Sequence, residues 1–224
     1  ARGPGPVGSW GMPLCFDLDG TLGHFNGGYQ LLREVLGTLW GEVPTEAQLR
    51  ACQGSTDWEI VHELHVAQFG MDLSEAGYRA FEAACLARFE GAFGAEGREP
   101  VIYAGIVAGL NALHLQGTAV ALVSGNAPSL LAFKARALGV HGDIPLWGSR
   151  PGHSRADLIR GALVGCEGPH LYVGDRPHDL QAAREVGLPF LGVGPHVPGD
   201  HPVLEPAALS QQLFYAVERV LSGI

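Results

Sequence analysis

The stretch PLCFDLDGTL at residues 13–22 decides the fold that we expect for this chain. Its first four residues form a short apolar run, which ends abruptly in Asp17-Leu-Asp19, followed by Gly20 and Thr21. An apolar run of this length that stops at turn-forming residues is typical of a buried strand that opens into a polar loop. The first strand is therefore expected to deliver two carboxylates to a loop at its carboxyl end.

From residue 98 onward, strand patterns alternate with helical patterns. Apolar and β-branched runs predict strands over residues 118–123, 144–147, 170–173 and 189–193. Helical spacing of apolar residues predicts helices over residues 107–115, 129–138, 156–164, 180–186 and 209–221. Repeated strand–helix units of this kind indicate an α/β fold, a doubly wound (Rossmann-like) parallel sheet with helices on both faces.

Residues 29–93 differ in texture, because their apolar residues recur at helical spacing with no strand pattern. We therefore expect a small all-helical cap at residues 25–97, inserted after the first strand of an α/β core formed by residues 12–24 and 98–224. Residues 1–11 are rich in Gly and Pro. They are expected to be a disordered arm or residues added during cloning, and not a signal peptide.

The composition narrows the classes of partner. The formal charge is −9, which argues against nucleic acid or an anionic membrane as a partner. No run of about 20 apolar residues is present that could span a membrane. Four widely spaced cysteines without a CxxC pair predict reduced thiols in a cytoplasmic protein, and the ten histidines lack the spacing of zinc ligands.

Three of the predicted strands end in polar clusters. Asp17 and Asp19 follow the first strand, Ser124 begins a second cluster, and Asp175 lies in a third. Functional residues of parallel sheets gather beyond the carboxyl ends of the strands, so we expect these loops to meet in one crevice. If the strand period continued, Asp17 and Asp19 would face the same side.

Clustered carboxylates repel one another unless a cation lies between them. Asp175 adds a further hard oxygen ligand, and Asp179 follows four residues later. Oxygen ligands from separate loops are typical of Mg²⁺. The hydroxyl of Ser124 and the backbone amides of Gly125 and Asn126, next to a helix N-terminus, could bind a phosphate group.

Together these motifs resemble those of the haloacid dehalogenase-like hydrolase superfamily, in particular its phosphoglycolate phosphatase-type members with a helical C1-type cap. The resemblance rests on residues 17–21 (DLDGT), the strand-ending Ser124 and residues 174–179 (GDRPHD), in that order. It covers the chain from about residue 12. The resemblance implies an Mg²⁺-dependent phosphatase.

The resemblance also implies a role for each motif residue. Asp17 would be the nucleophile that forms an aspartyl-phosphate, and Asp19 would protonate the leaving alcohol and later deprotonate water. Mg²⁺ would be held by Asp17, the backbone carbonyl of Asp19 and Asp175, with Asp179 in support. Ser124 would bind the transferring phosphoryl group, and Thr21, Gly125 and Asn126 would also bind the substrate.

One position departs from the family pattern. The family usually has a lysine ahead of the Gly-Asp strand, whereas the one lysine here, Lys134, lies in the middle of the helix after Ser124. By its helix context, Arg155 is the expected replacement, with Arg150 as the second choice. In the cap, Arg50 and the turn at residues 53–56 are expected to reach over the cleft and meet the substrate.

The resulting functional hypothesis is hydrolysis of a small phosphorylated metabolite by a monomer or homodimer. Two alternatives stay open at this point. One is a phosphosugar mutase of the same superfamily, which would transfer the phosphoryl group to a sugar phosphate instead of water. The other is a catalytically silent binding protein with the same fold, for which the missing lysine is the only support.

Overall fold

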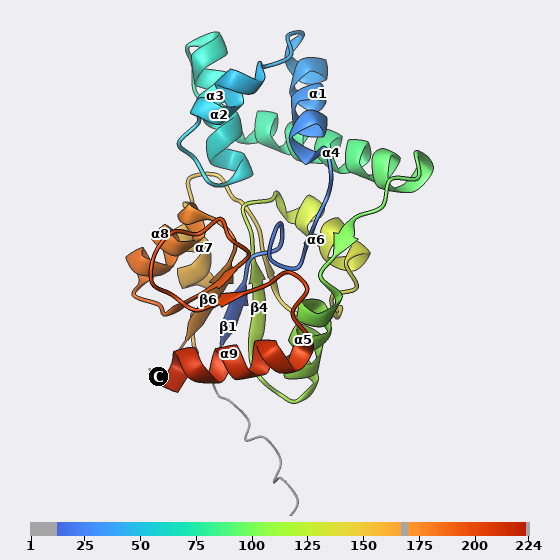
Figure 1. Cartoon of the computed structure of the whole chain (residues 1–224). Helices are drawn as coiled ribbons and strands as arrows, with labels where there is room; N and C mark the ends of the chain where they lie inside the picture. The colour runs from blue at the N-terminus through green and yellow to red at the C-terminus, as the bar shows by residue number, and fades with distance from the viewer. Residues whose placement is uncertain (1–12, 167–169, 223–224) are drawn as a thin grey trace, which may run out of the picture.

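The computed structural model describes residues 13–166 and 170–222, so the prediction for residues 1–11 lies outside the described part. Its centre is a six-stranded, all-parallel sheet (Figure 1). In spatial order the strands are β5 (Leu146–Trp147), β4 (Val120–Val123), β1 (Leu14–Phe16), β6 (Leu171–Gly174), β7 (Phe190–Val193) and β8 (Val203–Leu204). The order reverses direction at β1, as in a doubly wound fold, so the predicted fold class is confirmed.

Alternate residues of the strands pack into two cores, one on each face of the sheet. Leu14 and Phe16 of β1 belong to one core, and Cys15 between them belongs to the other. Since successive strand residues point to opposite faces, both faces must be covered by helices. The first core includes α5 (Ala104–Leu115), α6 (Pro128–Ala137) and α9 (Ser210–Ser222), and the second includes α7 (Arg155–Ala162) and α8 (Pro177–Val186).

The strand register sets the level at which the functional loops begin. Phe16, the last residue of β1, is paired with Leu122 in β4 on one side and with Val173 in β6 on the other. All three strands run in the same direction, so they end at nearly the same height. The loops that follow them are therefore neighbours at one edge of the sheet.

Above this edge lie the helices of the predicted cap (Figure 1). They are α1 (Gly28–Trp40), α2 (Glu46–Ala51), α3 (Asp57–Phe69) and α4 (Glu75–Glu90), which continues into a π-helical turn, η1 (Gly91–Ala95). Capping boxes at Thr45 and Thr56 begin α2 and α3. An antiparallel pair of short strands, β2 (Gly23–His24) and β3 (Val101–Ile102), lies where the chain enters and leaves this part. The division at residues 25–97 stays a prediction.

The structure differs from the prediction mainly in its shortest elements. Helix α2 and strand β8 were not expected, because six and two residues are too few to show a period. Strand β5 begins at Leu146 rather than at residue 144. Helix α7 ends at Ala162 rather than at residue 164, and Val164 is 81% exposed, so the apolar pattern there did not mark a buried face.

Two composition-based expectations concern cysteines and membrane spans. All four cysteines are free thiols, and Cys15 and Cys85 are buried. Burial raises the pKa of the Cys15 thiol to about 12, so this thiol stays protonated. None of the helices within residues 13–166 and 170–222 is long and apolar enough to cross a membrane.

The central strand β4 supplies a test of the core. Leu122 is fully buried there, so Leu122→Ala should lower the free energy of unfolding by about 3 kcal/mol through lost burial and a residual cavity. Leu115, at the end of α5 and 70% exposed, is the matched control, and Leu115→Ala should change it by less than about 0.5 kcal/mol. Urea unfolding measures both. Equal losses in the two variants would contradict the packing described here.

Candidate active site

The loops after β1, β4 and β6 meet at the edge of the sheet that faces the cap. Asp17 directly follows β1, Ser124 follows β4 and Asp175 follows β6, and all three side chains are buried. The backbone amide of Asp17 donates to the carbonyl oxygen of Val173 (2.8 Å), which extends the pairing of β1 with β6 up to the first carboxylate. The predicted convergence of the strand-end loops is therefore present in the structure.

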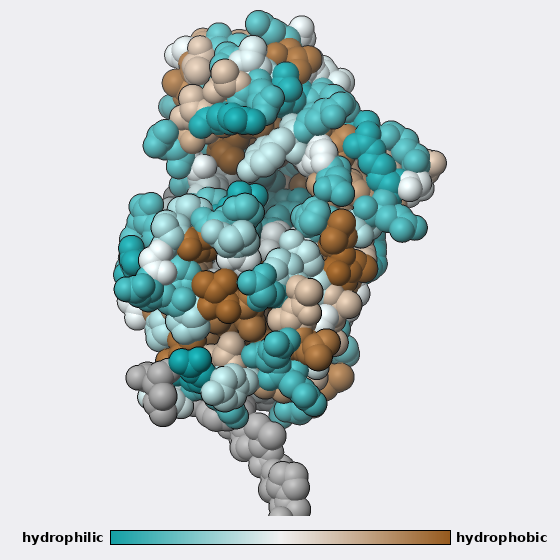
Figure 2. Space-filling model, viewed as in Figure 1, coloured by the Kyte–Doolittle hydropathy of each residue, from teal (hydrophilic) through white to brown (hydrophobic). Residues whose placement is uncertain are grey.

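A cavity of about 880 Å³ lies between the cap and these loops, and Figure 2 shows the surface hollowed there. Most of the predicted site residues line it, namely Asp17, Asp19, Arg50, Ser124, Gly125, Asn126, Arg155 and Asp175. Thr21 and Asp179 are fully buried and do not line the cavity. Thr21 therefore lies behind the wall, where its hydroxyl oxygen has no hydrogen-bond partner among the described residues.

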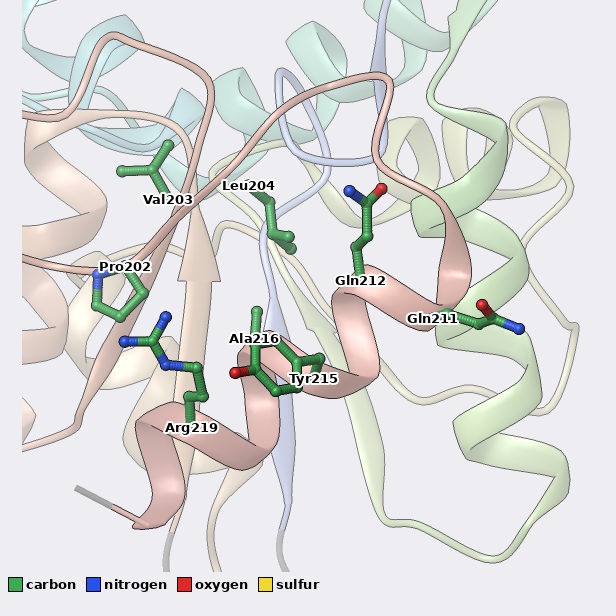
Figure 3. A pocket seen from close by; sticks show the side chains of 8 residues that line it. All are labelled: Pro202, Val203, Leu204, Gln211, Gln212, Tyr215, Ala216 and Arg219. Atoms are coloured by element: carbon green, nitrogen blue, oxygen red, sulfur yellow. The ribbon is translucent and has the colours of Figure 1, made fainter. Parts of the chain in front are cut away.

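A second hollow, of about 380 Å³, lies beside α9 on another part of the core. Its lining side chains are shown in Figure 3, and Arg219 is the one charged group among them. Its lining has no carboxylate and no histidine, and its one hydroxyl group is the phenol of Tyr215. The chemistry-bearing residues thus gather in the larger cavity.

Three buried carboxylates form a compact group in the larger cavity and its wall. Asp17, Asp175 and Asp179 each offer an oxygen, and these oxygens lie within 4.8 Å of one another. Burial, assisted by repulsion from Asp179, raises the pKa of Asp17 to about 6. Burial, assisted by repulsion from Asp17, raises the pKa of Asp175 to about 8. The Oδ1 atom of Asp175 is buried without a hydrogen-bond partner in the described part of the chain.

This donor set fits a divalent cation. Three hard oxygen donors, one after β1, one after β6 and one in α8, lie close together, and one of them is unsatisfied. Burial and mutual repulsion raise the pKa of Asp17 and Asp175, and a cation between the carboxylates would relieve that repulsion. Asp19 was expected to point into the same group, but its side chain lies elsewhere. The reason is local: β1 ends at Phe16, and Gly20 turns the chain with a φ of 84°, so the strand period does not extend to Asp19.

Asp19 is instead held by a buried lysine. Its Oδ2 atom accepts hydrogen bonds from Nζ of Lys134 (2.7 Å) and from the side-chain amide of Asn126 (2.7 Å). Lys134 also donates to Oδ1 of Asn126 (2.8 Å), and its ammonium group lies over the rings of Phe25 and Phe89. Lys134 was not predicted as a site residue, because it lies in the helix after Ser124, whereas the structure brings it into the cavity.

A signal for Lys134 was present in the sequence. In α6 the buried positions are Leu130, Leu131, Lys134 and Ala135, which is the spacing of one helix face. A lysine on the apolar face of an amphipathic helix needs a partner, since an unpaired buried ammonium group is costly. Its position therefore pointed to a nearby carboxylate.

Arg155 lies beside the first carboxylate, at the start of α7. Its Nη1 atom donates to Oδ1 of Asp17 (3.0 Å) and to Oδ1 of Asp179 (2.8 Å), and its Nη2 atom donates to the carbonyl oxygen of Ser55 in the cap (2.8 Å). Arg150, the second choice, lies with its guanidinium over the ring of Trp147. Of the two arginines considered for the lysine position, Arg155 is the one in contact with Asp17.

Asp179 joins the third loop to Arg155. Besides its ion pair, its Oδ2 atom accepts from the backbone amides of Asp175 (3.2 Å) and Arg176 (3.0 Å) at the start of α8. Burial raises its pKa, while Arg155 and these amides oppose the shift. Asp179 thus holds the Asp175 loop in place, and its side chain is shared between Arg155 and that loop.

The predicted phosphate-binding residues lie on the loop between β4 and α6. Ser124 Oγ accepts from the side-chain amide of Asn126 (2.8 Å). Arg50 of α2 also lines the cavity, although it is exposed and paired with Glu46. Its guanidinium therefore stands at the rim of the cavity rather than at the carboxylates.

A further buried carboxylate, not predicted from the sequence, comes from the cap. Oδ2 of Asp57, the first residue of α3, accepts from the backbone amide of Ala127 (2.8 Å), and the amide of Asp57 donates to the carbonyl oxygen of Gly125 (2.7 Å). Burial raises the pKa of Asp57 to about 6. Asp57 links the cap directly to the loop that carries Ser124.

Comparisons with known proteins identify the family and the fold. The family model for haloacid dehalogenase-like hydrolases matches residues 14–184, and the chain belongs to this family. A comparison with curated proteins gives no match. Among solved structures, a hydrolase from Pseudomonas syringae is similar, with 18% identity, coverage of 91% of this chain and 98% of that one, and a TM-score of 0.68.

Two further structures share the fold. A predicted phosphoglycolate phosphatase from Haemophilus somnus 129PT has 19% identity, covers 90% of this chain and 96% of its own, and has a TM-score of 0.59. CbbY from Rhodobacter sphaeroides, solved in complex with phosphate, has 17% identity, covers 87% and 94%, and has a TM-score of 0.65. At these identities the likeness concerns the fold.

Gly20 provides a test of the close approach between the first and third loops. A Cβ at Gly20 would lie 2.1 Å from Oδ2 of Asp175, and φ is 84°. Gly41 has a similar φ of 79° but open space around it. Gly41→Ala should cost about 1 kcal/mol of unfolding free energy from backbone strain, and Gly20→Ala should cost at least about 3 kcal/mol. Urea unfolding of both variants measures this, and equal costs would show that Asp175 does not pack against Gly20.

Asp57 provides a test of the buried cap carboxylate. Its pKa is about 6 in the folded protein against an ordinary 3.8, so the folded state binds the proton more tightly than the unfolded state. This group therefore makes the free energy of unfolding fall as pH rises through about 4 to 6. Between pH 5 and pH 8 the wild type should lose roughly 1 kcal/mol more than Asp57→Asn, in which the titration is absent.

Urea unfolding of both proteins at the two pH values measures the difference. Titrating groups that do not interact with Asp57 contribute equally to both proteins, so they cancel in the comparison. Parallel pH dependence of the two proteins would mean that Asp57 is not buried as described.

Proposed function

We propose that the protein is an Mg²⁺-dependent phosphomonoester hydrolase that acts on a small phosphorylated metabolite through an aspartyl-phosphate on Asp17. The observation that carries the proposal is the position of Asp17. Its buried carboxylate lines the cavity, is held on one side by Arg155, and lies next to a carboxylate group that fits a divalent cation. A carboxylate so placed can act as a nucleophile toward phosphorus.

In this proposal Mg²⁺ is held by the carboxylates of Asp17 and Asp175 and the backbone carbonyl of Asp19, with Asp179 in support. When bound, it supplies positive charge that offsets both the carboxylates and the phosphate oxygens. The hydroxyl of Ser124 and the amides of Gly125 and Asn126 bind the phosphoryl oxygens.

The reaction proceeds in two displacements. A carboxylate oxygen of Asp17 attacks phosphorus, the bond between phosphorus and the leaving oxygen breaks, and Asp19 gives that oxygen a proton. Water then attacks phosphorus, gives a proton to Asp19, and the bond to Asp17 breaks to release inorganic phosphate. Arg155 orients Asp17 through Nη1, and Lys134 and Asn126 position Asp19.

The cap has a part in the same proposal. Residues 25–97 open to admit substrate and close to exclude bulk water, with Arg50 at the rim of the cavity near the leaving group. The free thiols support a cytoplasmic location.

Names of related structures support phosphate chemistry. CbbY was solved with phosphate and, as a variant, with xylulose-(1,5)bisphosphate, and another similar structure is a predicted phosphoglycolate phosphatase. A putative β-phosphoglucomutase from Bacteroides vulgatus has the same fold. A small phosphorylated metabolite of the kind that a phosphoglycolate phosphatase hydrolyses is therefore our first candidate substrate. Comparing phosphate release with isomer formation on a panel of phosphoglycolate and sugar phosphates separates a hydrolase from a mutase.

Asp17→Asn tests the nucleophile. The amide is a poor nucleophile, so phosphate release from p-nitrophenyl phosphate with Mg²⁺ should fall by about 1,000-fold or more. Asp72→Asn, an exposed change in the cap that touches His62, should retain wild-type activity. Chelation of Mg²⁺ by EDTA should abolish the activity of both the wild type and Asp72→Asn. Near-normal turnover by Asp17→Asn would exclude Asp17 as nucleophile, and an inactive wild type across the panel would exclude the hydrolase.

A further inference from the structure

The cap contacts the core through a short segment, residues 55–58, which we call the docking segment. Three of its contacts involve its backbone. The amide of Asp57 donates to Gly125 O (2.7 Å), the amide of Trp58 donates to Oγ of Ser149 (2.8 Å), and the carbonyl oxygen of Ser55 accepts from Arg155 Nη2 (2.8 Å). This segment therefore lies against two loops of the core and one active-site side chain at once.

Asp57 contacts the Ser124 loop on both sides of Asn126. Its amide binds the carbonyl oxygen of Gly125, and its carboxylate binds the amide of Ala127 (2.8 Å). Ala127 precedes α6, its side chain cannot cap the helix, and Pro128 has no amide hydrogen to offer. Asp57, from a distant part of the chain, thus satisfies a donor at the N-terminus of this helix, where a negative charge is favourable.

The loop is shaped to receive the docking segment. A Cβ on Gly125 would lie 2.4 Å from the carbonyl oxygen of Ser55 and 2.8 Å from Nη2 of Arg155. Any larger residue would push the docking segment away. Among the described residues, the amide of Gly125 makes no hydrogen bond, so it remains available to a ligand oxygen in the cavity.

From these contacts we infer that Asp57 is a positioning residue for the phosphate-binding loop, residues 124–127, and that this loop has its binding shape only while the cap is docked. The inference rests on the proposed function, because it concerns how that site takes up the phosphoryl group. It adds a residue of the cap, at the wall of the cavity, whose role is to hold the loop. Phosphate binding and cap closure are coupled through Asp57, and each favours the other by the same factor.

Substitution of Asp57 tests this inference through phosphate affinity. Asp57→Ala removes a charge-assisted hydrogen bond to the loop, so KM for p-nitrophenyl phosphate and the inhibition constant of inorganic phosphate should both rise about tenfold. The reacting groups stay in place, so kcat should change by less than about threefold. Calorimetric titration of the full chain with inorganic phosphate in the presence of Mg²⁺ should give the same loss of affinity as the inhibition constant.

Two further variants keep the test decisive. Asp57→Asn retains an acceptor but not the charge, so it should weaken phosphate binding about threefold; it stands in for Asp57→Ala if that protein does not fold. Asp72→Ala, an exposed cap variant away from the core, should bind phosphate as the wild type does.

The outcomes separate two failures. Phosphate affinity within twofold of the wild type in Asp57→Ala, or in Asp57→Asn where Asp57→Ala does not fold, would overturn the positioning role. A lower kcat with unchanged KM would overturn it too, since that pattern reports a smaller folded fraction. If the wild type hydrolysed no phosphomonoester, the proposed function would fail, and the calorimetric comparison would still decide the role of Asp57.

Discussion

The structure depends on one buried contact, the guanidinium of Arg155 between the carboxylates of Asp17 and Asp179. All three side chains are almost completely withdrawn from water. In such surroundings a charge without a partner is destabilising by several kcal/mol. Removing one member of a buried pair is therefore destabilising, because it leaves the other charge unpaired. The contact joins residues that follow β1, begin α7 and lie in α8, so it ties three separate segments of the core together.

The same contact explains why an arginine, Arg155, can take the place of the lysine that the family pattern usually has. A lysine ammonium could satisfy one or two carboxylates as a compact charge, whereas the forked guanidinium has nitrogens that point in different directions. Here one nitrogen binds Asp17 and Asp179 while the other binds the cap at Ser55. Arg155 thus links Asp17 to Ser55 of the cap, whereas the single ammonium group of a lysine has no second nitrogen with which to reach both.

The sequence was sufficient for the parts of the site that follow from sheet topology. Asp17, Ser124 and Asp175 each follow an apolar run, and the rule that parallel strands end at one edge places them together. It was insufficient where contacts depend on how distant segments pack. Asp57 meets Gly125 and Ala127 across about 70 residues of sequence, and no local pattern encodes that pairing. The predicted direction of the Asp19 side chain was wrong for another reason. The strand stops at Phe16, so the alternation of strand side chains does not extend to Asp19.

The charged side chains around the cavity leave an excess of negative charge. Six carboxylates gather at or behind its wall and face four cationic side chains. The carboxylates are Asp17, Asp19, Glu46, Asp57, Asp175 and Asp179, and the cationic side chains are Arg50, Lys134, Arg155 and Arg176. An excess of two negative charges remains, which is the charge that one divalent cation offsets. Without that cation, a phosphate group approaching Asp17 would meet repulsion from Asp175 and Asp179. The excess of acidic groups therefore fits the proposed function, in which a bound divalent cation would let an acidic cavity accept an anion.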